Sequence, residues 1–215
     1  ELLLASGNQV FGLCRSVDRL ASGVIGVECD LKDEKSVRSA FECVKSDAGE
    51  IDVLINNAGV ALLSKISDGA LSEWDEMWQV NVRGLALCCQ LSLGLLNNQR
   101  GQIINISSMS GHRVPASGGF YAPTKFAVRA VTDALRSELK QVDSRIRVSS
   151  ISPGFVDTPL LDSYFKGRTE ALKSTKQQMK MLSAEDIAES IVHAINTPMH
   201  VEIGDIQLRS VDQKS

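Results

Sequence analysis

Long apolar runs and an excess of charge of one sign are both missing from this sequence of 215 residues. No stretch approaches the roughly 18 apolar residues that a membrane-spanning helix needs, so we predict no transmembrane span. The 23 lysine and arginine residues and the 26 aspartate and glutamate residues are interspersed, and the net charge is −3. Such a surface lacks the basic patch that binds nucleic acid or an anionic membrane, and we therefore expect neither as a partner.

Cysteine is scarce, and none of the five residues Cys14, Cys29, Cys43, Cys88 and Cys89 has the spacing of a metal-ligand motif. An odd number in mostly apolar surroundings is typical of small core residues in a reducing compartment, not of a disulfide framework. The sequence also has no signal-peptide pattern. We therefore expect a cytoplasmic protein that binds no metal.

Apolar runs alternate with helical periodicities along the whole chain, which predicts a doubly wound α/β fold with helices on both faces of a parallel sheet. We find no repeat or second domain, so residues 1–215 are expected to form one three-layered domain. Residues 159–181 are polar and are expected to be irregular. The predicted strands are 9–14, 24–29, 51–55, 102–106, 146–151 and 205–208, and the predicted helices are 33–45, 71–96, 120–139 and 184–195.

Small and polar residues follow the carboxyl ends of five predicted strands. They are Arg15, Asp30, the sequence Asn-Asn-Ala-Gly at 56–59, Ser107 with Ser108, and Pro153 with Gly154. Ligands of an open parallel sheet bind outside the carboxyl ends of its strands. The sequence therefore predicts a ligand crevice at this edge.

Tyr121 and Lys125 are four residues apart on a predicted helix, so they share one face. Such a pair also arises by chance, as a surface tyrosine beside a solvated lysine. In a functional pair the lysine must stabilise the ionised tyrosine. Moving the pKa of a tyrosine from near 10 to about 7 takes about 4 kcal/mol of preferential stabilisation of the phenolate. A neighbouring ammonium acts in that direction, and the tyrosine can then exchange a proton with an alcohol oxygen.

Ser108 and Asn81 are two further candidates. A hydroxyl at Ser108, just after a predicted strand, can hold a substrate oxygen, or it can simply satisfy backbone groups. Asn81 is a poor helix former inside an apolar helical stretch and must find partners if it is buried. It is therefore either a structural bridge or part of a proton route.

Five motifs occur in the order and spacing of the compact, single-domain short-chain dehydrogenases and cover nearly the whole chain, so the sequence resembles this family. They are the 56–59 sequence, Asn81, Ile-Ser-Ser at 106–108, Tyr-x-x-x-Lys at 121–125 and Ser-Pro-Gly-Phe-Val-Asp-Thr at 152–158. The segments at 109–113, 197–200 and 204–209 resemble the branch that holds animal hydroxysteroid-type and insect farnesol-type dehydrogenases. Bacterial short hydroxy-acid dehydrogenases share part of this tail pattern.

The resemblance implies a Rossmann-type fold, a nicotinamide cofactor and a role for each matching residue. Tyr121 would be the general acid/base, and Lys125 would lower its pKa and bind the nicotinamide ribose. Ser108 would orient the substrate, and Asn81 would support a water relay. Pro153, Gly154, Val156 and Thr158 would hold the nicotinamide, Asn57, Ala58 and Gly59 would flank the adenosine half, and Asp30, followed by Leu31, would contact adenine. A charge at a helix N-terminus is the alternative for Asp30.

The sequence departs from the family pattern twice. Pro123 lies between Tyr121 and Lys125, and because proline is tolerated only in the first turn, the helix should begin near Tyr121. The first strand and its glycine-rich phosphate loop are also absent; residues 1–7 instead resemble the end of a helix closed by Gly7, with no initiator methionine. We therefore expect a chain shortened at its amino end, with a central strand missing between 9–14 and 51–55.

Arg15 and Ser16 decide the expected cofactor. NAD enzymes of this architecture place an acid after the second strand to bind the ribose 2′-hydroxyl, and NADP enzymes use an arginine for the 2′-phosphate. Here no acid stands at that turn, whereas Arg15 offers a planar guanidinium and Ser16 a hydroxyl. The sequence favours NADP over NAD; a solvated loop arginine is the alternative.

These observations predict an NADP(H)-dependent alcohol dehydrogenase or carbonyl reductase for an apolar substrate such as a steroid or terpenoid. Residues 159–181 would form a substrate lid. The rival functions are an NAD(P)-sensing regulator and a short hydroxy-acid dehydrogenase; a sugar-nucleotide epimerase is disfavoured because no carboxyl-terminal substrate domain follows. His112 is expected in a loop or the substrate pocket, and His193 is expected to be structural.

Helices 71–96 and 120–139 carry more apolar surface than one sheet face can cover, and they pair between subunits in the family. We therefore expect a homodimer or homotetramer. Leu85, Cys88 and Leu95 are the candidates for burial between subunits.

Overall fold

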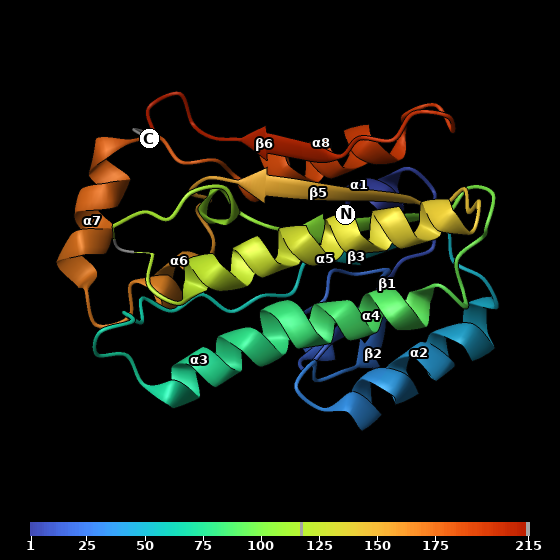
Figure 1. The fold of residues 1–215 in the computed structure, drawn as a ribbon, viewed down its shortest axis with the longest axis horizontal. Helices are drawn as coiled ribbons and strands as arrows, with labels where there is room; N and C mark the ends of the chain where they lie inside the picture. The colour runs from blue at the N-terminus through green and yellow to red at the C-terminus, as the bar shows by residue number, and fades with distance from the viewer. Residues whose placement is uncertain (117, 214–215) are drawn as a thin grey trace.

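The structure, a computed structural model, describes residues 1–116 and 118–213. In this part of the chain, six strands form two sheets in which every pairing is parallel (Figure 1). The smaller sheet pairs β1 (Phe11–Cys14) with β2 (Ile25–Glu28), and the larger has the order β3-β4-β5-β6. The strands of the larger sheet are β3 (Val53–Asn56), β4 (Gln102–Ile106), β5 (Arg147–Pro153) and β6 (Asp205–Leu208). The predicted parallel α/β fold is confirmed.

The break in the sheet falls between β1 and β3, which form no ladder with each other in the described residues. This is the position at which the sequence predicts a further strand. β1 and most of β3 are half-buried, whereas β5 is buried along its whole length. The facing edges of β1 and β3 therefore have no strand partner in the described residues.

Side chains that alternate along the strands separate two apolar layers, because successive residues of a strand point to opposite faces. Ile103 and Val148 pack against α4 (Leu85–Ser92) and α5 (Tyr121–Gln141). Ile104 and Ile151 pack against α8 (Ala184–Ile195) on the other side. In Figure 1, α4 and α5 lie in front of the strands and α8 lies behind them.

The helix predicted over 33–45 is α2 (Glu34–Ala48), and its predicted apolar face is the buried one. Asp33 caps its amino end by accepting a hydrogen bond from Lys35 N at 2.9 Å. The face packs against β2 and α4, as the buried residues of this helix show: Val37, Ala40, Phe41 and Val44. Among the described helices, none is long and apolar enough to cross a membrane.

The helix predicted over 71–96 is present as one helical run, but it ends at Ser92 and contains a π turn that the sequence did not predict. α3 (Leu71–Trp78) passes into a π-helical stretch, η2 (Gln79–Gly84), before α4 begins at Leu85 and ends at Ser92. π turns inside helices are frequent at functional sites, and this one contains Asn81. The apolar pattern of the sequence is nearly unchanged across the π turn, which is why periodicity alone does not reveal it.

Residues 159–181 are not irregular, contrary to the expectation. They contain α6 (Pro159–Tyr164), with proline in its first turn, and α7 (Thr169–Gln178), which extends at the left edge of Figure 1. α7 buries none of its residues, and an ion pair of 2.7 Å joins Lys176 to Asp157. Only Ala171 and Leu172 are apolar in α7, too few to form the repeated apolar face by which a helix is predicted from sequence.

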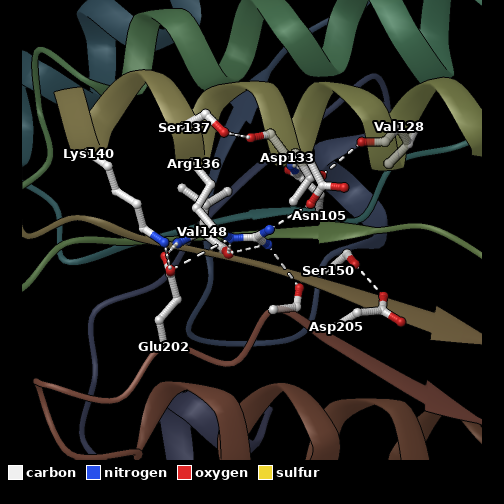
Figure 2. Close-up of polar contacts among 12 residues, drawn as sticks. Asn105, Val128, Asp133, Arg136, Ser137, Lys140, Val148, Ser150, Glu202 and Asp205 are labelled. Atoms are coloured by element: carbon white, nitrogen blue, oxygen red, sulfur yellow. Dashed lines mark hydrogen bonds and ion pairs between the residues drawn. The ribbon is translucent and has the colours of Figure 1, made fainter.

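Arg136 on α5 ties this helix to β5 and to the residue before β6 (Figure 2). Its guanidinium donates to Val148 O at 2.8 and 3.0 Å and to Gly204 O at 3.0 Å, and it also pairs with Asp133 and Glu202. These contacts fix the register of β6 beside β5, and thereby the place of Asp205.

The residues expected between subunits are instead part of the core of the chain. Leu85, Cys88 and Leu95 pack beneath α4 against the sheet and α2, with at most 6% of each exposed. The large apolar residues that do remain exposed on the same layer include Trp78 and Phe126, at 46% and 38%. Most of the apolar surface of these helices is therefore buried within the chain itself.

Candidate active site

A cavity of about 710 Å³ opens at the carboxyl ends of the larger sheet. Its size is that of a small-molecule site. The lining comes from the segments after β3, β4 and β5, from the start of α5 and from α6. Of the residues predicted for the site, those that line it are Asn57, Gly59, Ser107, Ser108, Tyr121, Lys125, Pro153, Gly154, Val156 and Thr158.

Tyr121 is the first residue of α5, which confirms that the helix begins where Pro123 requires it. The turn before it is tightly constrained, because Phe120 N donates to Ser64 O at 2.8 Å and Gly119 has a φ of +48°. A Cβ on Gly119 would collide with Ser64 O, so only glycine allows the chain to pass here. This turn aims the phenol of Tyr121 into the cavity.

The phenol of Tyr121 is buried, with 9% of the residue exposed, and it forms a hydrogen bond with Ser108. Burial raises the pKa of Tyr121 above its ordinary value; the Ser108 hydrogen bond lowers it by less, and Tyr164 adds to the rise. The Tyr164 ring lies edge-on at 5.8 Å between centroids. The chain by itself therefore holds Tyr121 in its protonated form.

Lys125 lies one turn along α5 and is 5% exposed. Its Nζ donates to Ile106 O at 2.9 Å and lies 5.8 Å from the centroid of the Tyr121 ring. Burial lowers the pKa of Lys125 to about 8. At neutral pH an ammonium therefore lies against the phenol, in the arrangement expected from the spacing of the two residues.

Asn81 uses its whole amide as a bridge. Its Oδ1 accepts from Val60 N, and its Nδ2 donates to Val60 O, each at 2.8 Å. Nδ2 also donates to Thr124 Oγ1 at 3.1 Å, and Thr124 in turn donates to the backbone oxygen of Tyr121 at 2.7 Å. The structural role of Asn81 is thus evident in its contacts, and the proton route stays a prediction.

Gly59 supplies open space between the polar groups of the site. A Cβ at this position would lie 3.4 Å from Asn81 Oδ1 and 3.8 Å from Lys125 Nζ, so any side chain here would pack directly against both polar groups. On the opposite side, Pro153, Val156 and Thr158 line the same cavity. These residues are suited to a nicotinamide ring with its polar amide. The attached ribose can accept a hydrogen bond from the Lys125 ammonium.

Five predicted cofactor contacts lie away from the cavity lining: Ala58, between two lining residues, and four residues after β1 and β2. Arg15 is exposed, and its guanidinium has no hydrogen bond or ion pair with the described residues, whereas Ser16 precedes a short 3₁₀ turn. Asp30 Oδ1 accepts from Lys32 N at 3.0 Å, next to the half-buried Leu31. Because Asp33 is the N-cap of α2, Asp30 is not needed for that role.

The sequence did not point to several residues of the cavity. Val60, Met109, Phe155, Leu161 and Tyr164 supply much of its apolar wall. They come from loops and from α6, where no periodicity marks an apolar residue as part of a site. Met109 and Phe155 lie within the segments 109–113 and 152–158, but the motifs assign neither residue a role. Arg113 also lines the cavity; it is the last residue of the segment 109–113, whose pattern assigns it no role.

The family model described as short chain dehydrogenase matches residues 3–169. Dehydrogenase/reductase SDR family member 11 of Bos taurus is 38% identical over 228 residues, covering 98% of this chain and 89% of the relative. Its counterpart from Homo sapiens is also 38% identical, with 98% and 88% covered.

Solved structures agree with these matches. The closed form of serine dehydrogenase complexed with NADP+ has a TM-score of 0.89 and 27% identity, covering 100% of this chain and 90% of that one. An alcohol dehydrogenase from the archaeon Thermococcus sibiricus, complexed with 5-hydroxy-NADP, has a TM-score of 0.85 and 26% identity, with 99% and 90% covered. With the Tyr121, Lys125 and Ser108 arrangement in a parallel α/β fold, these matches show that the chain belongs to the short-chain dehydrogenase family and is an oxidoreductase.

Proposed function

We propose that the protein interconverts an alcohol and a ketone or aldehyde with NADP(H), with Tyr121 as general acid/base. The observation that carries this proposal is the buried Tyr121 phenol, hydrogen-bonded to Ser108 and backed by the Lys125 ammonium at the floor of the cavity. When bound, the nicotinamide donates or accepts the hydride. The protein supplies the proton and the orientation of the reacting oxygen.

Each polar residue has a distinct task in this proposal. Ser108 donates a hydrogen bond to the substrate oxygen, and Tyr121 donates its proton to that oxygen in the direction of reduction. Lys125 favours the phenolate that remains and binds the ribose. Asn81 holds the Gly59–Val60 turn and α5 together, which keeps the site in register. Asn57, Ala58, Gly59, Pro153, Gly154, Val156 and Thr158 are the proposed further contacts of the cofactor, with Asp30 and Leu31 near its adenine.

An apolar alcohol or ketone is the proposed substrate, because Val60, Leu161, Tyr164 and Phe155 supply the wall of the cavity. Segment 159–181 is proposed as the lid. Its first helix, α6, places Tyr164 against Tyr121, and therefore next to the reacting oxygen. The lid belongs to the same single domain in this proposal.

A hydroxy acid is the second candidate, and Arg113 is the observation that favours it. Arg113 lines the cavity together with Ser108, and its guanidinium forms no hydrogen bond or ion pair within the described part of the chain. A guanidinium in a mostly apolar wall is suited to a carboxylate. The similarity to a serine dehydrogenase adds to this reading.

A screen of substrates tests the proposal and separates the two candidates. Steroids, terpenoid alcohols, hydroxy acids and the corresponding ketones are offered with NADPH or NADP⁺, and the absorbance of the reduced nicotinamide is followed. Turnover of an apolar alcohol or ketone supports the first candidate, and turnover confined to hydroxy acids supports the second. Binding of NADPH without turnover of any compound would contradict both.

Arg15 is proposed to bind the 2′-phosphate, with Ser16 beside it, because its guanidinium is exposed at the end of β1 and unpaired among residues 1–116 and 118–213. Replacing Arg15 with Asp should weaken NADPH binding and improve NADH binding, since a carboxylate repels the phosphate and accepts from a 2′-hydroxyl. Losing one charge-assisted pair corresponds to roughly 1.5–3 kcal/mol, or about 10- to 150-fold in NADPH affinity. Titration calorimetry with both cofactors measures it, and Arg19→Asp, an exposed arginine on the next turn, is the matched control. Equal preference for NADPH in Arg15→Asp and the wild type would remove Arg15 from the site.

A homodimer or homotetramer is proposed for the assembly, supported by the exposed aromatic side chains of Trp78 and Phe126 on the α3–α5 layer. Replacing Trp78 with Glu should shift the protein toward the monomer, because a charge would have to be buried between subunits. Light scattering at micromolar concentration measures the mass. A wild-type monomer would contradict the assembly, and an unchanged oligomer in Trp78→Glu would place the interface elsewhere.

A further inference from the structure

A polar cluster behind the Ser108 loop joins three segments that are distant in the sequence. His112 follows the 3₁₀ turn η3 (Met109–Gly111), Ser152 lies in β5, and Asp205 is the first residue of β6. His112 Nε2 lies 3.0 Å from Ser152 Oγ and 3.3 Å from Asp205 Oδ2. Ser152 is fully buried, and the roles proposed above use none of the three residues.

The hydrogen bonds of the cluster determine which atom of His112 carries a proton. Ser150 and Ser152 both donate to Asp205 Oδ1, the latter at 2.7 Å, and Figure 2 shows the contact with Ser150. A hydroxyl has one proton, so Ser152 Oγ can only accept from His112. Nε2 of His112 is therefore protonated and donates to Ser152, with the buried Asp205 Oδ2 close by. This assignment holds for both the neutral and the charged ring.

Asp205 is a rigid anchor for the imidazole. Besides the two serine hydroxyls, the adjacent Gly204 O accepts from Ser150 N at 3.0 Å and from Arg136 at 3.0 Å. Through Asp205 and Gly204, the His112 imidazole is therefore connected to both β5 and α5. Burial lowers the pKa of His112, an effect that Asp205 opposes and Arg129 reinforces, so the ring is largely neutral near pH 7.

The turn between Ser108 and His112 transmits this anchoring to the site. Gly111 N donates to Ser108 O at 2.8 Å, and Ser110 N donates to Ser108 Oγ at 3.0 Å. Arg129 holds Gly111 O at 3.0 Å from the side of α5. Ser108 Oγ lies 3.5 Å from Pro153 O, the residue that follows Ser152, so the histidine link closes a short loop around this serine.

We propose that His112 is a positioning residue of the dehydrogenase site: its link to Ser152 and Asp205 fixes the Ser108 hydroxyl relative to Tyr121 and the Pro153–Gly154 segment. This proposal rests on the proposed function, in which Ser108 holds the substrate oxygen. His112 does not touch the reacting atoms. It acts through Ser108, and that dependence is what an experiment can detect.

Hydrogen–deuterium exchange of the cofactor-free protein tests the anchor without any turnover. His112→Leu removes the donor and should speed exchange in the peptide that spans 108–113 by at least about 10-fold, because the turn loses its attachment to β5 and β6. His112→Gln offers an amide N–H near the position of Nε2 and should keep the protection. His193→Leu, at an exposed position of α8, is the control and should leave the 108–113 peptide unchanged. Equal exchange in His112→Leu and the wild type would overturn the anchor.

A double-mutant cycle tests whether the anchor acts through Ser108. We expect His112→Leu to lower kcat by about 10- to 100-fold, the scale of displacing a positioned group by 1 Å, with NADPH affinity within about twofold of wild type. His112→Gln should recover most of that loss. In a Ser108→Ala background, His112→Leu should lower kcat by less than about threefold, because the serine that it positions is gone.

The two readouts separate this proposal from the function on which it rests. A full loss from His112→Leu in the Ser108→Ala background would mean that the histidine acts independently of Ser108, and would overturn the positioning role. If the wild type turns over no substrate but its 108–113 peptide still depends on His112 for protection, the proposed function fails and the anchor stands. If the enzyme is active and exchange is insensitive to His112, the anchor fails and the function stands.

Discussion

Tyr121→Phe is expected to lower kcat by at least about 100-fold, the contribution typical of a lost general acid/base, while NADPH affinity changes little. The substitution removes one oxygen atom and keeps the ring that packs against Tyr164. Because burial raises the pKa of Tyr121, the wild-type phenol is protonated across the neutral range and is ready to act as an acid in reduction. Stopped-flow measurement of NADPH oxidation under saturating substrate isolates this step.

The other tyrosine of the chain is a matched control for this experiment. Tyr164→Phe likewise removes a phenol oxygen, here from the proposed lid. The centroid of the Tyr164 ring lies 5.8 Å from that of Tyr121. It is expected to change KM more than kcat, since Tyr164 contacts the cavity but donates no proton to the substrate. A Tyr121→Phe enzyme that keeps most of its turnover would exclude Tyr121 as the proton donor, and another acid would have to be sought.

The central pair of the site could be predicted from sequence because its geometry is local. A spacing of four on one helix brings Lys125 to Tyr121, and Pro123 fixes where that helix starts. Ser108 could be predicted because parallel strands deliver their carboxyl ends to one edge. In each case a short stretch of chain carries the whole argument.

The remainder of the site depends on pairings that no local pattern contains. His112 and Asp205 are far apart in the chain and meet only because β6 lies beside β5. Asn81 in the π turn bonds to Val60 and Thr124, which belong to other segments. α7 buries no residue and contains only two apolar ones, too few to predict a helix from their spacing. Leu85, Cys88 and Leu95 were assigned to an interface because the sequence does not say how much apolar surface α2 and the sheet already cover.

Lys125→Met is expected to stabilise the cofactor-free protein while lowering kcat by at least about 100-fold, because the charge that favours the phenolate is lost. Burial lowers the pKa of Lys125 from 10.5 to about 8. The unfolded chain therefore binds more protons than the folded one between about pH 8 and 10.5, and this residue makes stability rise with pH in that window. Below about pH 8 the buried charge costs roughly 3 kcal/mol, at about 1.4 kcal/mol per pKa unit.

Methionine removes that cost but leaves Ile106 O without its donor, a loss of about 0.5–1.5 kcal/mol. The variant should consequently gain about 1–2 kcal/mol in the free energy of unfolding at pH 7, and the gain should shrink as the pH rises from 8 toward 10. The buried cysteines act in the opposite sense in the wild type, because burial raises the pKa of Cys89 to about 11 and that of Cys88 to about 12. Only the difference between variant and wild type therefore isolates Lys125.

Urea denaturation at pH 7, 8, 9 and 10 without cofactor measures this difference. Lys140→Met is the matched control: it lies on the same helix and pairs with Glu202, but 69% of its side chain is exposed. Because an exposed pair contributes about 0–1 kcal/mol, that variant should be neutral or slightly destabilised at every pH. If Lys125→Met is destabilised at pH 7, or if its gain does not shrink with rising pH, then the lysine is not held as a buried charge at neutral pH. Its proposed role, a cation that the fold keeps beside Tyr121 at the expense of stability, would then be wrong.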